Sequence, residues 1–276
     1  MPPTPTDLSD TSTWLPLDGL APGFDANKAA HCAELDGREI TLTDERGTRI
    51  AQRFTADTVS WEYHPGRGDD MAAGSGEDAY EAFEVDTGLV YAQFQHEHRP
   101  HEAVSLVLDL AAGRALSVLS TIGEPASHRT RVRQRFVASL IEGVDAAGRP
   151  PAPTSTLVGR RVLWQYSAEH AYEHVYLSPH WYSWHCLAGP EQGLADTDES
   201  TAYELRPGIY LFAWREKVIP CASVTVADHR DLHRMRSHGV LFGLDESGEV
   251  PTHFTFGAHG RLLGTTAYPP TLDPAR

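Results

Sequence analysis

Short runs of alternating apolar and polar residues recur along most of the chain. Examples are REITLTDERG from Arg38, TVSWEYHPG from Thr58 and GLVYAQFQ from Gly88. An alternation of period two places one set of side chains on each face of an extended chain, and aromatic and β-branched residues favour strands. Gly, Pro and Asp interrupt the runs at the spacing typical of sandwiches and barrels. The pattern therefore predicts an all-β, antiparallel protein.

The same pattern occurs twice, at an offset of about 120 residues. The segment GLVYAQFQHEHRPHEAVSLVL from Gly88 aligns without a gap with GIYLFAWREKVIPCASVTVAD from Gly208. Upstream, LDGREITL from Leu35 matches LVGRRVLW from Leu157, and VSWEY matches YSWHC. Three matches in the same order indicate an internal duplication. We therefore expect two tandem antiparallel β-barrels.

A different pattern separates the two halves. The segment HRTRVRQRFVASLIEGVDAAGRPP from His128 spaces Val132, Phe136 and Leu140 four residues apart and ends in Gly and two prolines. This spacing predicts an amphipathic helix followed by a linker. The expected organisation is a flexible N-terminal tail (1–30), a first barrel (31–125), a helical linker (126–154), a second barrel (155–266) and a C-terminal tail (267–276).

Length, composition and net charge limit the classes of partner that the protein is expected to bind. A length of 276 residues fits two domains, and 41% hydrophobic residues suffice for two cores. A net charge of −15 disfavours nucleic acid and anionic membranes. No apolar run approaches the roughly 18 residues that span a bilayer, and the N-terminus lacks the pattern of a secretion signal. Three cysteines without a CxxC spacing favour a reducing compartment. We expect a cytoplasmic protein that uses no cofactor or metal. Its expected partner is a small molecule, and a homo-oligomer is compatible with the sequence.

Several segments resemble the MoaF family, and the resemblance covers both halves. They are LVGRRVLWQY, YEHVYLSPHWYSWHC, GIYLFAWREKVIP, HGVLFG and FTFGAHGRL. The resemblance implies lipocalin-like (calycin) barrels and no particular reaction.

The second half also resembles the phenolic acid decarboxylases, which share that barrel. The matching stretches are LWQYS, with Trp164 and Tyr166, and GIYLFAWREK, with Trp214 and Glu216. In that family a tyrosine pair holds the substrate carboxylate and a glutamic acid protonates the side-chain double bond. The resemblance implies these roles for Tyr166 and Glu216, with Trp164 at the place of the first tyrosine.

Strand parity predicts which side chains share a barrel interior, because residues two apart lie on one face. The sets are Trp164 with Tyr166, Tyr172 with His174, Tyr182 with Trp184, and Trp214 with Glu216. Desolvation in an apolar pocket raises the pKa of a carboxyl and prepares Glu216 to shuttle a proton. The alternative for Glu216 is an ion pair at the barrel rim.

The other aromatic and histidine positions have two interpretations each. Tyr166 either orients a substrate or is a core tyrosine with a satisfied hydroxyl. Trp184 and Trp214 either stack on a ligand or belong to the core, and His174 is either catalytic or structural. We expect Trp164 and Tyr182 to contact substrate as well.

In the first half, His96 stands at the position of Glu216, and Trp61 of VSWEY stands at that of Trp184. His98 follows His96 on the same predicted face, and we expect all three to contact a ligand. The HxHxxxE spacing of His96, His98 and Glu102 also resembles a cupin metal motif.

Three functions are compatible with these residues. The first is a cofactor-independent lyase or isomerase, possibly decarboxylase-like, that uses Glu216, Tyr166 and His174 for general acid–base catalysis on a small aromatic acid or amine. The second is a non-catalytic binding protein of lipocalin type. The third is a cupin-like metal-dependent enzyme.

Overall fold

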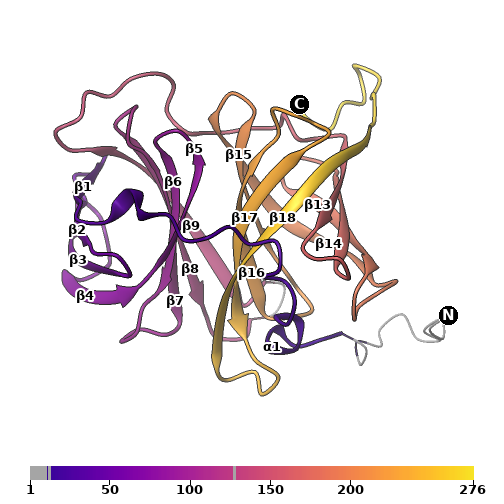
Figure 1. The fold of residues 1–276 in the computed structure, drawn as a ribbon, viewed down its shortest axis with the longest axis horizontal. Helices are drawn as coiled ribbons and strands as arrows, with labels where there is room; N and C mark the ends of the chain where they lie inside the picture. Colours follow the sequence, from indigo (N-terminus) through magenta and orange to yellow (C-terminus); the bar gives the residue numbers. More distant parts are fainter. Residues whose placement is uncertain (1–10, 12–13, 127–128) are drawn as a thin grey trace. The chain divides into compact units, whose positions relative to one another are not determined.

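A computed structural model describes residue 11, residues 14–126 and residues 129–276 (Figure 1). Two nine-stranded antiparallel sheets account for nearly all regular structure, which confirms the all-β prediction. The chain divides into two compact units. The first barrel is built from Ala29–Gly123 and Arg133–Ala152. The second barrel combines Pro153–Arg276 with Glu124–Val132 and the described residues up to Lys28.

The first barrel has the strand order β4-β3-β2-β1-β9-β8-β7-β6-β5 and is preceded by a 3-10 turn, η1 (Ala33–Leu35). Its strands are β1 (Glu39–Asp44), β2 (Arg49–Phe54), β3 (Thr58–His64), β4 (Gly74–Ala79), β5 (Glu81–Asp86), β6 (Leu89–Gln95), β7 (Glu102–Asp109), β8 (Arg114–Ile122) and β9 (Val132–Ile141).

The second barrel has the order β10-β14-β13-β12-β11-β18-β17-β16-β15, and an additional β14–β15 pairing closes it. A short helix, α1 (Leu17–Leu20), belongs to the same unit. Its strands are β10 (Ala152–Pro153), β11 (Arg160–Gln165), β12 (Ala171–Tyr176), β13 (Trp181–Ala188), β14 (Ala195–Arg206), β15 (Ile209–Arg215), β16 (Cys221–Asp228), β17 (Met235–Leu244) and β18 (Pro251–Thr265).

The two barrels repeat one topology. In the first, β4 pairs with β3 and β5 pairs with β6, and the two strands are separated only by Tyr80. Together they take the place of the long strand β14, which pairs with both β13 and β15. Gly88 and Gly208 turn the equivalent hairpins at positive φ (67° and 80°), a conformation that glycine adopts without strain.

Alternating burial confirms the period-two pattern. On β13, Tyr182, Trp184 and Cys186 are buried while the residues between them are partly exposed. On β1, Ile40 and Leu42 face the core of the first barrel. Each barrel therefore buries an aromatic and aliphatic core of its own.

The predicted linker helix is wrong, because residues 132–141 form strand β9. β9 lies between β1 and β8 and takes the place that β18 takes between β11 and β17. Hydrogen bonds to two neighbouring strands outweigh a helical spacing of apolar residues. Leu140 is 47% exposed, so no continuous apolar helix face exists. His128, the first residue of the predicted helix, lies outside the described residues.

The N-terminal segment also differs from the predicted flexible tail. Residues 14–28 belong to the second barrel, where Leu17 and Phe24 join its core. Residues 1–10 and 12–13 of the predicted tail lie outside the described part of the chain.

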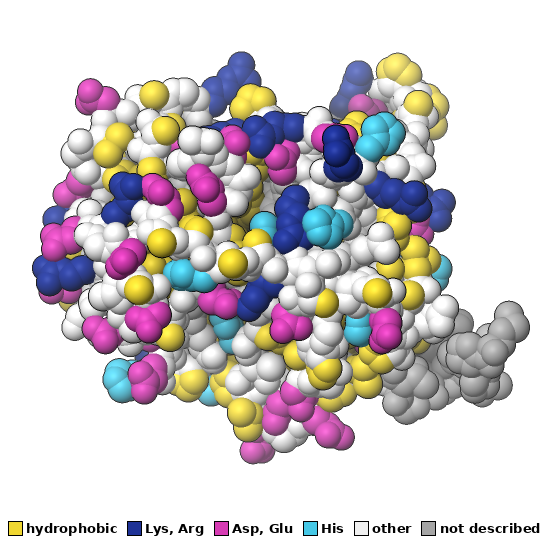
Figure 2. Space-filling view, viewed as in Figure 1, with side chains coloured by type: hydrophobic (Ala, Val, Ile, Leu, Met, Phe, Trp, Pro, Cys, Tyr) yellow, Lys and Arg dark blue, Asp and Glu magenta, His cyan; other side chains and the backbone are white. Residues whose placement is uncertain are grey.

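Charged side chains of both signs are interspersed on the face shown in Figure 2. None of the described helices is long and apolar enough to cross a membrane.

Candidate functional site

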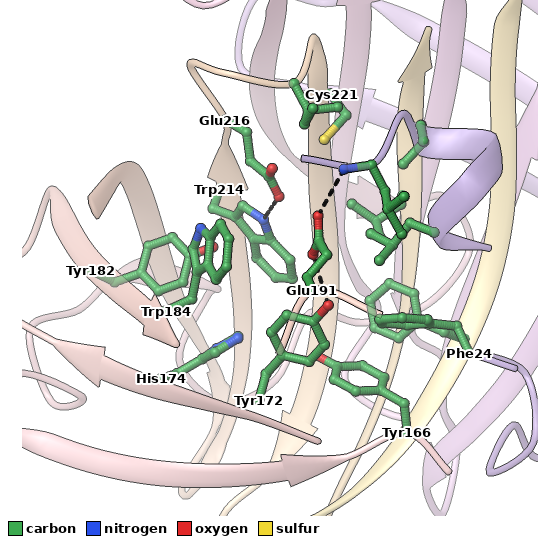
Figure 3. A pocket seen from close by; sticks show the side chains of 16 residues that line it. Phe24, Tyr166, Tyr172, His174, Tyr182, Trp184, Glu191, Trp214, Glu216 and Cys221 are labelled. Atoms are coloured by element: carbon green, nitrogen blue, oxygen red, sulfur yellow. Dashed lines mark hydrogen bonds between the residues drawn. The ribbon is translucent and has the colours of Figure 1, made fainter. Parts of the chain in front are cut away.

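A pocket with a cavity volume of about 40 Å³ lies inside the second barrel (Figure 3). Six residues that the sequence predicted as site residues line it. They are Tyr166, His174, Tyr182, Trp184, Trp214 and Glu216. Strands β11, β12, β13 and β15 carry these residues or end next to them, so strand alternation brings them to one interior face.

Glu216 follows the last residue of β15. Its backbone N–H donates to the carbonyl of Cys221 (3.0 Å), which ties it to the start of β16. The indole Nε1 of Trp214 donates to Oε1 of Glu216 across 3.0 Å. Burial, reinforced by the nearby carboxyl of Asp198, raises the pKa of Glu216 to about 8, although the Trp214 bond opposes the shift. Glu216 is therefore largely protonated at neutral pH.

Asp198 on β14 is 1% exposed and supports this end of the pocket. Its Oδ2 accepts the indole N–H of Trp184 (2.9 Å), and its Oδ1 accepts the backbone N–H of Lys217 (3.3 Å). Burial raises the pKa of Asp198, while the Lys217 ammonium, 3.4 Å from Oδ1, opposes that shift. The bond to Asp198 fixes the Trp184 indole plane in the pocket wall.

A second carboxyl, Glu191, reaches the pocket from the loop between β13 and β14. Its Oε2 accepts the hydroxyl of Tyr172 (2.9 Å), and its Oε1 accepts the backbone N–H of Leu15 (3.3 Å), both drawn in Figure 3. Burial raises the pKa of Glu191. The sequence analysis did not predict Glu191, because the sequence of the loop between β13 and β14 does not indicate that its side chains enter the barrel.

His174 on β12 lies in an aromatic environment, with the rings of Tyr182 and Trp214 at 5.1 and 5.6 Å. It is 5% exposed, and its Nδ1 has no hydrogen-bond partner among the described residues. Burial lowers the pKa of His174 to about 3, so the imidazole is neutral. It can accept or donate a hydrogen bond to a ligand but carries no charge.

The N-terminal segment covers one side of the pocket. Leu15, Leu17, Leu20 and Phe24 contribute to its lining. The ring of Phe24 lies 4.6 Å from that of Tyr166. These contacts increase the apolar character of the site and explain part of the burial of its carboxyl groups.

Trp164 is buried as parity predicts but is not among the described residues that line the pocket. It packs on Gly260, where a Cβ atom would lie 2.4 Å from the indole, and its ring centroid is 5.7 Å from that of His229. Trp164 therefore belongs to the core of the second barrel, and its predicted contact with substrate stays a prediction.

The first barrel contains a cavity of about 90 Å³ lined in part by Trp61 and His96. Nδ1 of His96 lies 2.7 Å from Oδ2 of Asp78, and Trp61 Nε1 donates to the same oxygen across 2.7 Å. The backbone N–H of Glu97 donates to Asp78 Oδ1 (2.8 Å). Asp78 thus orients both ring systems at the cavity wall.

His98 does not share a face with His96. Strand β6 ends at Gln95, and His98 lies exposed in the following turn. The buried His96 and the exposed His98 therefore do not form the His-x-His pair of the cupin-like alternative, and the predicted ligand contact of His98 stays a prediction. The described part of the chain holds no cluster of three or more His, Cys, Asp or Glu arranged for a metal ion.

The two barrels share one polar arrangement. In each, a buried aspartate accepts an indole N–H and a backbone N–H, as Asp78 does in the first barrel and Asp198 in the second. These aspartates are 120 residues apart, the same offset as His96 and Glu216. Aligning the two halves over a longer stretch at this offset would have identified Asp78 and Asp198 as equivalent residues.

Family models and a curated relative identify the same family. The MoaF N-terminal domain matches residues 12–124, and the MoaF C-terminal domain matches residues 151–266. Protein MoaF from Klebsiella aerogenes is 31% identical over 191 residues, 65% of this chain and 72% of that protein. A crystal structure of a protein of unknown function from the DUF3598 family of Nostoc punctiforme aligns with a TM-score of 0.36 and 11% identity, covering 81% of this chain and 93% of that chain.

Proposed function

This chain belongs to the MoaF family, and from the pocket of its second barrel we propose a cofactor-independent enzyme of lyase or isomerase type that moves a proton on a small aromatic molecule. One observation carries the proposal. Glu216 combines a pKa of about 8 with a place in an aromatic pocket, and a carboxylic acid that is protonated near neutral pH is a competent general acid.

The other residues have supporting roles in this proposal. Trp184 and Trp214 form aromatic walls on which a planar ligand stacks. Tyr166 and neutral His174 offer hydrogen-bonding groups that orient the ligand relative to Glu216. Trp214 holds the Glu216 carboxyl through Oε1, so the acid presents a defined oxygen.

The charges around the pocket favour an amine over a carboxylic acid. Glu191 and Glu216 line it, and neither Lys nor Arg occurs among the described lining residues. A ligand carboxylate would find no cation to replace its hydration, whereas an ammonium group is attracted by the aromatic faces that line the pocket. We therefore propose a small aromatic amine as the ligand class.

The runner-up is a binding protein of lipocalin type. The apolar N-terminal segment supports it, because Leu15, Leu17, Leu20 and Phe24 enclose the pocket as a retained ligand would require. Both functions use the same pocket and differ only in whether a proton reaches a carbon atom of the ligand.

Proton transfer to carbon can be tested without knowing the substrate. We suggest incubating the protein with a mixture of cellular small molecules in D₂O and searching by mass spectrometry for a compound that gains deuterium or changes structure. The wild type should give such a compound and Glu216→Gln should not. Glu169→Gln, which changes an exposed glutamate of the same barrel, is the matched control.

Two results would contradict the enzyme proposal. If Glu216→Gln retains turnover, Glu216 is not the acid. If a compound binds at one equivalent without exchange or conversion, the lipocalin-like alternative is correct. The ligand class is tested separately by calorimetry with benzylamine and benzoate, which match in size. Tighter binding of benzoate would exclude the amine.

A further inference from the structure

The cavity of the first barrel has polar atoms without partners. Gln52 and Thr48 line it and are 6% and 7% exposed. Gln52 Oε1 and Thr48 Oγ1 accept or donate no hydrogen bond within the described part of the chain. A buried polar atom without a partner costs about 1–3 kcal/mol. A bound molecule that supplies the missing hydrogen bonds is therefore stabilised in this cavity.

His96 presents a further acceptor to the same cavity. Its Nδ1 is bound to Asp78, which selects the tautomer that carries the proton on Nδ1 and leaves Nε2 as an acceptor. Burial lowers the pKa of His96 despite the neighbouring aspartate, so the ring is neutral. An acceptor nitrogen held in this way can accept a hydrogen bond from a ligand.

The remaining walls suit a planar ligand. The ring centroid of Trp61 is 4.7 Å from that of His96, and Phe94 lies on the same strand face two residues before His96. The guanidinium of Arg99 lies 5.2 Å from the Trp61 ring centroid and is paired with Glu102 (3.0 Å). The Arg99 cation is thus paired, and Gln52 Oε1 is a buried acceptor left for a ligand.

The internal repeat supports a ligand at this place. Gln52 stands opposite Trp61 in the β2–β3 register, as His174 stands opposite Trp184 in the β12–β13 register. Gln52 Oε1 and His174 Nδ1 are both buried without a partner among the residues described. Both barrels therefore keep an unpaired polar atom at the same position beside the same tryptophan.

We propose that the first barrel holds a second binding site, for a small hydroxylated aromatic compound of phenol or catechol type, whose hydroxyl groups donate to His96 Nε2 and Gln52 Oε1. The site is chemically opposite to the pocket of the second barrel. Glu216 there is a protonated acid, whereas His96 and Gln52 here are acceptors. The proposal does not depend on any reaction in the second barrel.

Catechol is a direct probe, and 1,2-dimethoxybenzene is its matched control because methylation removes both donors. By isothermal titration calorimetry, catechol should saturate the wild type at one site and bind at least about tenfold more tightly than 1,2-dimethoxybenzene. Equal affinity, or no saturable binding of catechol, would overturn the proposal. This comparison uses the wild-type protein alone and needs no variant to fold.

Variants then locate the site. His96→Asn and Gln52→Leu should each weaken catechol binding about tenfold or more, with circular dichroism confirming the fold. His98→Asn, which changes an exposed histidine two residues away, and Glu216→Gln should leave the affinity unchanged. Catechol binding that is lost in Glu216→Gln but retained in His96→Asn would place the ligand in the second barrel and overturn the proposal.

Discussion

Trp184 donates its indole N–H to Asp198 across 2.9 Å, and the pair repeats the bond between Trp61 and Asp78 in the first barrel at 2.7 Å. The neighbour of each aspartate differs between the barrels. Asp78 binds an imidazole, whereas Asp198 lies near a second carboxyl, Glu216. The same Trp–Asp pair thus lies beside a hydrogen-bond acceptor in the first barrel and beside a protonated acid in the second.

Neutralising Asp198 should lower the pKa of Glu216 below its value of about 8, because the Asp198 charge is one cause of the shift. The measurement is an NMR titration of the glutamate carboxyl carbons in Asp198→Asn. Asp231→Asn, at an exposed carboxyl of the same barrel, is the control and should leave the titration unchanged. An unchanged Glu216 titration in Asp198→Asn would contradict the electrostatic coupling.

Glu216 should make the protein less stable as the pH rises. Its folded-state pKa of about 8 exceeds the ordinary 4.5, so the folded state holds the proton more tightly than the unfolded state. The stabilisation is fully present below pH 4.5 and is lost between pH 4.5 and 8. The free energy of unfolding of Glu216→Gln minus that of the wild type should therefore be about 1–3 kcal/mol larger at pH 8 than at pH 5. Urea denaturation at both pH values measures it, and a constant difference would contradict the buried-acid assignment.

His174 should act in the opposite direction. Its folded-state pKa of about 3 lies below the ordinary 6.5, so the unfolded state binds the proton first. The stabilisation is present above pH 6.5 and is lost as the pH falls toward 3. The wild type should lose about 2 kcal/mol in free energy of unfolding between pH 6.5 and 4.5 because of His174. His174→Gln, which places at this position the residue type of Gln52 in the first barrel, should not show that loss. His180→Gln, at an exposed histidine, is the control, and an equal effect there would contradict the prediction.

Phe24 should anchor the N-terminal segment on the second barrel. It is 3% exposed and packs on Tyr166. Phe24→Ala should lower the free energy of unfolding of the second barrel by about 2–4 kcal/mol and open its pocket to an apolar dye. Leu272→Ala, at a residue 72% exposed, should change it by less than about 0.5 kcal/mol. Similar effects of both substitutions would show that the segment is not anchored by Phe24.

The sequence by itself determined the features that depend on local pattern. Alternation of apolar residues is a property of neighbouring positions, so it predicted the strands and the interior faces of Trp184, Trp214 and Glu216. The offset of 120 residues predicted two barrels of one topology and placed His96 at the position of Glu216.

Tertiary structure decided what depends on partners far apart in the chain. β9 is a strand because β1 and β8 offer hydrogen bonds on both sides, and a local helical spacing does not contain that information. Glu191 and Phe24 reach the pocket from a loop and from the N-terminal segment, whereas Trp164 lies outside it. The pKa of Glu216 likewise follows from burial and from Asp198, both consequences of closing the barrel, because desolvation and charge proximity are set by distance in space.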